Sequence, residues 1–124
     1  MPSLQLDDNR ALYQIRAFQI GMIQVNDKKY SESLIVTPTQ LIESWAPQIF
    51  SQLTANDLQM VAKLKPDIIL LGTGSTLIFP SIEMYGDLIN QGIGVEIMDT
   101  RAACRTYNAL SAENRNVAAC LIIR

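Results

Sequence analysis

The sequence predicts an α/β domain built around a largely parallel β-sheet. Residues 68–71 form an uninterrupted apolar run that is closed by Gly72 and Gly74. A strand that is apolar on both faces belongs inside a sheet that is covered on each side, which is typical of α/β architecture. From residue 54 onward, helical and extended patterns alternate, as they do in right-handed crossovers between parallel strands. A length of 124 residues indicates a single domain over residues 1–124.

The first part of the chain is predicted to form an antiparallel β-hairpin. Residues 11–20 and 22–25 are extended segments in which apolar and polar residues are mixed on both sides. Asn26 and Asp27 are residues that favour a turn between two strands. Residues 29–37 complete the hairpin, and the proline that follows them ends it.

The segment over residues 40–53 has conflicting signals. Its apolar residues have helical spacing, but Pro47 would break a helix at that point. We therefore interpret the segment as irregular, with room for a short strand. Trp45, the only tryptophan, is expected to fill the core between the hairpin and the sheet.

Helices and strands alternate through the rest of the chain. Thr54 has the features of a helix N-cap, and Asp99-Thr100 is a second capping pair. The direction of the last strand cannot be read from the pattern. The predicted elements are a helix over 54–65, a strand over 66–71, a helix over 80–92, a strand over 94–98, a helix over 101–110 and a strand over 117–123.

Composition excludes several classes of function. Ten Lys and Arg residues against twelve Asp and Glu residues give a net charge of -2, so no global basic field attracts nucleic acid or a membrane surface. The chain has no histidine, which removes the usual general base and the commonest zinc ligand. Cys104 and Cys120 lie in apolar contexts without CxxC spacing, and we expect buried, reduced thiols. A reactive Cys104 would need a lowered pKa, for which Arg101 and Arg105 are the only hint.

The same features favour a soluble, cytoplasmic protein. Every apolar run is far shorter than the roughly 20 residues of a membrane-spanning helix. Asp7 and Asp8 stand near the N-terminus with Arg10 as the only base. This start resembles neither a secretory signal nor a transit peptide.

A candidate binding surface lies at the carboxyl edge of the predicted sheet. If the strands over 66–71 and 94–98 are parallel, the loops after them meet at one edge, where open α/β sheets bind ligands. Arg101, Arg105 and Asn108 follow at i, i+4 and i+7 and share one helix face. Two arginines beside a glycine loop suit a carboxylate, a phosphate or an acidic protein surface, although a solvated face paired with nearby acids fits the pattern equally well. The candidate residues are Gly72, Thr73, Gly74, Asp99, Thr100, Arg101 and Arg105.

Nucleotide-binding and catalytic interpretations of this edge are weaker. The third glycine of a dinucleotide fingerprint is replaced by Leu77, and the next helix starts only after Pro80. No GK[ST] sequence forms a Walker loop. Glu96 and Asp99 are close in sequence, but nothing marks them as an acid and a base with separated pKa values. Hydroxyl nucleophiles in the loop would have no histidine to activate them.

Several short motifs spread over most of the chain carry a family resemblance. They are Leu71-Gly72-Thr73-Gly74, Phe79-Pro80, Gly94-Val95-Glu96, Met98-Asp99-Thr100, Ala103-Cys104, Tyr107-Asn108 and Val117-Ala118-Ala119. Together they resemble domain-of-unknown-function family 498, which includes the mitochondrial respiratory complex I assembly factor 3. The hairpin turn departs from the family, because Asn26-Asp27 stands where members often have Asn-Gly.

The resemblance implies a three-layer α/β domain, with a central mixed sheet flanked by helices and an added N-terminal antiparallel hairpin. It also implies that most members have no assigned enzyme activity, and that the mitochondrial relative acts through protein contacts. The leading hypothesis is therefore a non-enzymatic protein-interaction or assembly module, with a protein partner on the candidate surface and no cofactor or metal.

Two alternatives stay open beside this hypothesis. The first is a small-molecule or anion-binding domain, including an unrecognised enzyme, that uses the loop from Gly72 to Gly74 with Arg101 and Arg105. The second is self-association through an exposed sheet edge.

Overall fold

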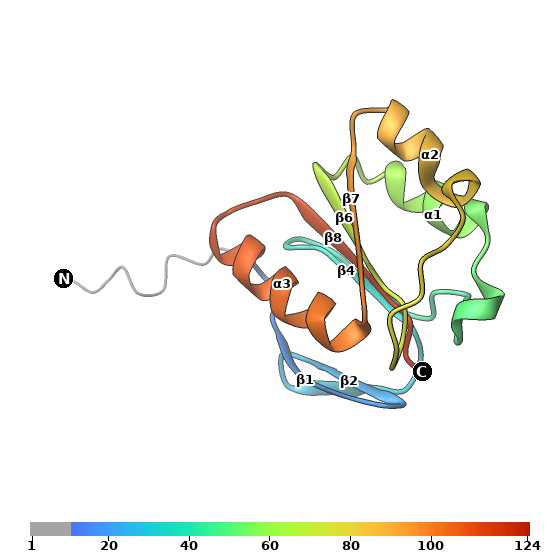
Figure 1. Ribbon diagram of the computed structural model, residues 1–124. Helices are drawn as coiled ribbons and strands as arrows, with labels where there is room; N and C mark the ends of the chain where they lie inside the picture. Colours follow the sequence, from blue (N-terminus) through green and yellow to red (C-terminus); the bar gives the residue numbers. More distant parts are fainter. Residues whose placement is uncertain (1–10) are drawn as a thin grey trace.

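The computed structural model describes residues 11–124 and confirms the predicted α/β fold (Figure 1). The residues on which the expectation about a leader segment rests, 1–10, lie outside this part. The central sheet contains β5 (Leu41–Ile42), β4 (Leu34–Val36), β8 (Val117–Leu121), β6 (Ile68–Gly72) and β7 (Gly94–Met98), in this spatial order. A second sheet contains β1 (Ile15–Gln19), β2 (Met22–Val25) and β3 (Lys28–Tyr30). The α-helices are α1 (Ala55–Ala62), α2 (Ile82–Asn90) and α3 (Thr100–Ala112).

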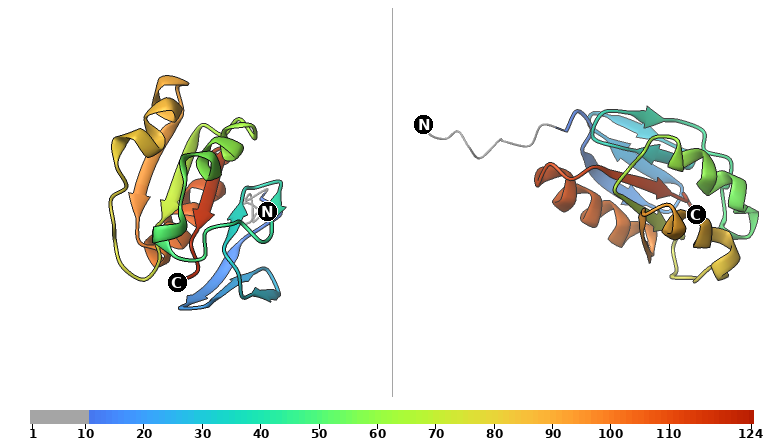
Figure 2. Two further views of the ribbon diagram at one scale, coloured as in Figure 1. Left: turned by 90° about the vertical axis from the view of Figure 1, so that its right-hand side faces the viewer. Right: turned by 90° about the horizontal axis from the view of Figure 1, so that it is seen from above.

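The central sheet separates two apolar cores. α1 and α2 cover one of its faces, while α3 and the second sheet cover the other (Figures 1 and 2). Successive side chains of a strand point to opposite faces, so Leu70 packs towards α3 and its neighbours Ile69 and Leu71 pack towards α1 and α2. β8 is buried along its whole length, because it lies between two strands and beneath both helical layers.

The direction of the last strand follows from its pairing. β8 is parallel to β6, and β6 is parallel to β7. β4 pairs antiparallel with the other edge of β8, which makes the sheet mixed but largely parallel. The carboxyl ends of β6 and β7 therefore lie at one edge, as predicted, and the pairing places the carboxyl end of β8 at the same edge.

The single strand predicted over residues 29–37 is wrong, because two strands in different sheets divide this segment. β3 extends the hairpin of β1 and β2, whereas β4 enters the central sheet. Ser33, which is completely buried between them, explains the change of direction. Its hydroxyl accepts a hydrogen bond from the Ile123 N–H at 2.9 Å, and its own N–H donates to the Gln48 side chain at 2.9 Å.

The ambiguous segment after β4 contains the short strand β5 and a 3₁₀ turn over Phe50–Gln52. Trp45 is only 1% exposed, and its indole N–H donates to the Asp57 carbonyl oxygen at 3.2 Å. The prediction that Trp45 is buried in the core is confirmed, but the predicted location is wrong: Trp45 packs in the core beneath α1 and α2, and not in the one between the hairpin and the sheet. Both predicted helix caps form as well: Thr54 and Asp57 make a reciprocal capping box, and the Asp99 carboxylate accepts from the Ala102 N–H at 2.8 Å.

The second sheet is fastened to α3 by polar contacts to its backbone. The Asn108 amide accepts from the Ile15 N–H at 3.0 Å and donates to the Ile15 carbonyl at 2.7 Å. The Tyr107 hydroxyl donates to the Tyr13 carbonyl at 2.7 Å. β1 therefore lies along α3, and the surface between these two elements has a fixed shape.

Candidate functional site

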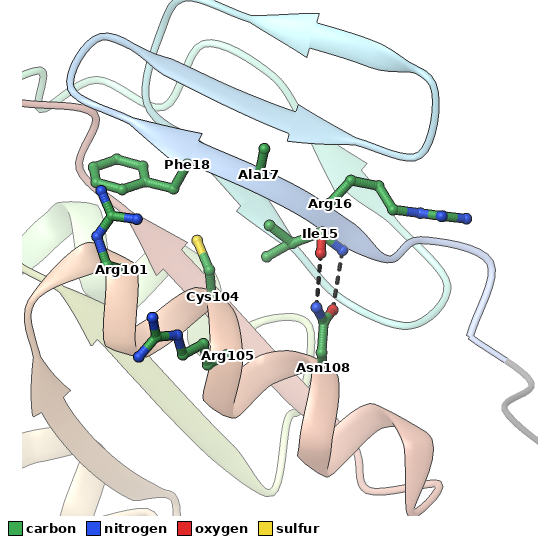
Figure 3. Close-up of a pocket in the computed structure, with 8 residues that line it drawn as sticks. All are labelled: Ile15, Arg16, Ala17, Phe18, Arg101, Cys104, Arg105 and Asn108. Carbon is green, nitrogen blue, oxygen red and sulfur yellow. Dashed lines mark hydrogen bonds between the residues drawn. The ribbon is translucent and has the colours of Figure 1, made fainter.

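A groove between β1 and α3 is lined by Arg101 and Arg105 of α3 and by Arg16 of β1, whose side chain extends away from the other two (Figure 3). Its volume is about 220 Å³. We call it the arginine groove and define it by the residues that line it. They are Ile15, Arg16, Ala17, Phe18, Arg101, Cys104, Arg105 and Asn108.

Successive turns of α3 supply one wall of the groove. Arg101, Arg105 and Asn108 lie on the face that points to β1, as their spacing predicts. Asn108 holds β1 at one end through its two bonds to Ile15. At the other end, the Arg101 guanidinium carbon lies 5.5 Å from the centroid of the Phe18 ring, which is a cation–π contact. The arginines are thus presented on a rigid frame.

The electrostatics of the groove are one-sided. None of the residues that line it carries a carboxylate, although the chain as a whole has a net charge of -2. Arg101 and Arg105 are both exposed, so their charges are accessible to a partner. Glu96, an acid close to these arginines in sequence, is an exposed residue on the edge strand β7. The groove therefore favours a negatively charged occupant.

A second hollow of about 180 Å³ extends the groove towards the end of β6. Phe18 and Arg101 line both hollows, and Asp99 and Gly74 line the second. The parallel pairing of β6 with β7 brings the two predicted loops together at this edge. The predicted residues Asp99, Arg101 and Gly74 consequently lie beside one another.

The glycine loop is buried inside the structure, and its polar groups bond to the fold. The Thr73 N–H donates to the Met98 carbonyl at 2.9 Å, and the Gly74 N–H donates to the Thr100 hydroxyl at 2.8 Å. That hydroxyl donates in turn to the Ile122 carbonyl at 2.8 Å. Gly72, Thr73, Gly74 and Thr100 are all buried. An anion at this edge would therefore be held by arginine side chains, because these two loop amides already have acceptors.

Sequence reasoning missed two of the side chains that shape the groove. Arg16 and Phe18 come from β1, which is far from α3 in the sequence. Only the helical spacing of Arg101 and Arg105 in α3 indicated, from the sequence, one wall of the groove. No pattern within β1 indicated that it would form the other wall.

Cys104 lines the arginine groove but is only 6% exposed. Burial raises its pKa from the ordinary value of 9.0 to about 12, and the nearby Arg101 lowers it only partly. Cys120 is completely buried, and burial raises its pKa as well. The prediction of buried thiols is confirmed. The Cys104 thiol is protonated at neutral pH, so it is not poised as a nucleophile.

The raised pKa of Cys104 predicts a loss of stability in alkaline solution. The folded state favours the protonated thiol, which therefore contributes to the unfolding free energy. This contribution is fully present below about pH 9 and is lost as the pH rises towards 12. The loss is at most about 1.4 kcal/mol for each pH unit. In the wild type, the unfolding free energy from urea denaturation should be lower at pH 10 than at pH 7. In Cys104→Ala, this decrease should be smaller by about 1 kcal/mol. An unchanged decrease in that variant would contradict the assignment.

Within residues 11–124, no group of three or more His, Cys, Asp or Glu side chains is placed to hold a metal ion. In the same part of the chain, no helix combines the length and apolar character needed to cross a membrane. The described site is therefore defined by arginines, an aromatic ring and an amide.

The fold and the groove define a small α/β domain with an arginine-lined groove between β1 and α3. Residues 15–122 match the model of a family described as "Protein of unknown function (DUF498/DUF598)". The chain belongs to this family, which confirms the resemblance seen in its motifs.

Individual relatives extend this comparison. The chain is 32% identical over 125 residues to the "13 kDa major membrane protein" of Francisella tularensis subsp. holarctica, covering 99% of this chain and 100% of that protein. It is 35% identical over 89 residues to the zebrafish (Danio rerio) "NADH dehydrogenase [ubiquinone] 1 alpha subcomplex assembly factor 3", covering 70% of this chain and 51% of that protein. The chain thus spans about half the length of this second relative.

A solved structure agrees with the fold. The crystal structure of a Bordetella parapertussis protein is 38% identical in sequence and superimposes with a TM-score of 0.86. The match covers 92% of this chain and 98% of that protein. The likeness therefore includes the strands and helices that frame the groove.

Proposed function

We propose that this protein is a non-enzymatic interaction module, similar to an assembly factor, and that it binds an acidic segment of a partner protein in the arginine groove. The observation that carries the proposal is the pair of exposed arginines of α3, Arg101 and Arg105, in the wall of one hollow without a lining carboxylate. Planar guanidinium groups bind carboxylates in a bidentate manner. The relatives named as assembly factors support an assembly role and hence a protein partner.

The size of the groove favours a protein segment over a small molecule. A volume of about 220 Å³ is below the roughly 300–1,000 Å³ of typical ligand pockets. It suits one or two acidic side chains of a larger partner. In the alternative of an anion-binding domain, the arginines could still bind the anion. The glycine loop could not donate the Thr73 and Gly74 amides to it, because both are hydrogen-bonded within the fold.

Charge reversal tests this proposal. We expect Arg101→Glu combined with Arg105→Glu to lower partner binding at least tenfold, since both attractive charges become repulsive. The measurement is affinity capture from the source cells at low salt, with quantitative mass spectrometry of the retained protein. The unfolding free energy should change by no more than about 1 kcal/mol, the upper range for the Arg101 contact with Phe18.

Arg115→Glu is the matched control. Arg115 is also exposed, but it lines a different hollow, beside Asn114 and Asn116. A partner retained by the wild type and by this control, and lost from the double variant, supports the proposal. A partner that the double variant retains equally well would remove the arginine groove from the interface.

A further inference from the structure

An apolar ridge lies on the opposite face of the central sheet from the arginine groove. We define the ridge by Leu77, Ile78 and Phe79 in the loop after β6 and by Ile82 and Ile89 of α2. Phe79 is 69% exposed and Ile82 is 57% exposed, which is unusual for large apolar side chains that adjoin one another in sequence. Figure 2 shows α2 beside the edge strand β7, on the face of the central sheet away from α3 and the second sheet.

The backbone that carries the ridge is held in place. The Thr73 hydroxyl donates to the Thr76 carbonyl at 2.6 Å and accepts from the Ile78 N–H at 3.2 Å. Thr73 is itself only 1% exposed. The loop is therefore tethered to the end of β6 on both sides of Leu77, which lowers the cost of ordering it when a partner binds.

The shape of α2 suits contact with another helix. Ile82, Gly86 and Ile89 follow at i, i+4 and i+7 and share one face. A Cβ atom added at Gly86 would meet only the Ile82 side chain, at 3.8 Å. The glycine thus leaves a notch between the two isoleucines, and a side chain from a facing helix could enter it.

Charge identifies the occupant more closely. Glu83 and Asp87 are exposed beside this stripe, one turn apart, and α2 contains no Lys or Arg. Glu96 on β7 adds a third exposed carboxylate on a neighbouring element. In a two-fold contact between copies of this chain, residue i of one copy meets residue j of the other, so the carboxylates of one α2 would face a second α2 that has no Lys or Arg. A second copy is therefore a poor occupant, whereas basic residues are complementary.

We propose that the apolar ridge binds an amphipathic helix of a partner protein, with apolar residues at helical spacing and Lys or Arg along its flanks. This inference is independent of the arginine groove, because it uses a different face and the opposite charge. The protein would then join two partners, one acidic at α3 and one basic at α2.

A pair of synthetic peptides tests the ridge directly. Each has about 18 residues, enough to be helical, with leucines at i, i+3, i+4 and i+7. One carries lysines on its flanks, and the other carries glutamates at the same positions. Fluorescence anisotropy gives each dissociation constant, and amide chemical shifts of the labelled protein locate the contact.

We expect the lysine peptide to bind at least tenfold more tightly than the glutamate peptide, with shifts confined to residues 76–90. Ile82→Ser with Ile89→Ser should weaken binding at least tenfold, and so should Phe79→Ser alone. Glu83→Lys with Asp87→Lys should reverse the preference between peptides. Leu12→Ser, which alters an equally exposed apolar residue of another surface (65% exposed), should bind as the wild type does.

Four results with the peptides and in sedimentation would overturn the proposal. They are equal binding of the two peptides, binding that survives the serine variants, shifts centred on α3, and a wild-type dimer in sedimentation that the isoleucine variant converts to a monomer. The last result would assign the ridge to a second copy. Binding of the wild type to neutral phosphatidylcholine vesicles, if lost in the serine variants, would assign it to lipid and would also overturn the proposal.

Discussion

Replacing Thr100 with valine is expected to lower the unfolding free energy by roughly 2–6 kcal/mol, although the two side chains have almost the same shape. The Thr100 hydroxyl accepts from the Gly74 N–H and donates to the Ile122 carbonyl, each at 2.8 Å, and the residue is completely buried. Valine would leave both backbone groups without a partner. An unsatisfied buried polar group costs about 1–3 kcal/mol.

Urea denaturation of the valine and serine variants separates this effect from packing. Thr100→Ser keeps the hydroxyl and loses only a methyl group, so its loss should be close to 1 kcal/mol, the cost of about one buried methylene. If the valine variant were as stable as the serine variant, the two hydrogen bonds would not contribute as described. The comparison therefore measures how much the hydrogen bonds of this buried hydroxyl, which link α3 to the ends of β6 and β8, contribute to the unfolding free energy.

Gly72→Ala is expected to cost about 1–3 kcal/mol, the usual range for overpacking a dense core. The added Cβ would lie 2.9 Å from the Thr100 hydroxyl oxygen, 3.0 Å from the Thr100 Cα and 3.2 Å from the Ala103 Cβ. Two of these atoms belong to rigid positions of α3. The helix would have to move away from the end of β6, which would also disturb the Thr100 hydrogen bonds.

Gly94→Ala is the matched control for this substitution. Gly94 also lies in a parallel strand, but a Cβ there would be 3.6 Å from its nearest neighbour, the Asp67 carbonyl oxygen. We expect the unfolding free energy to change by no more than about 0.5 kcal/mol. Equal losses at Gly72 and Gly94 in thermal unfolding would show that a general strand effect, and not the contact with α3, is responsible.

Local patterns predicted most of the fold after residue 54. The apolar run of β6, the caps at Thr54 and Asp99, and the alternation of elements are each visible within a few residues. The division of residues 29–37 was not visible. It depends on Ser33, which bonds to Ile123 across 90 positions, and short-range periodicity contains no such information.

The candidate site was predictable to a smaller extent. Helical spacing placed Arg101 and Arg105 on one face, but the opposite wall depends on Asn108 binding Ile15 across 93 positions. The glycine loop suggested a binding site because glycines allow close backbone approach. For Gly72, the atoms that approach are those of α3. A sequence shows that a glycine is needed without showing which neighbour requires it.

The central place of β8 has a consequence for how the chain acquires its structure. β8 is the last strand along the sequence, yet it lies between β4 and β6 and contributes the only pairing that joins them in the described residues. During synthesis, β4 and β6 therefore have unpaired edges until β8 emerges. Such edges favour aggregation. Closure of the central sheet is thus expected to be a late, long-range step of folding.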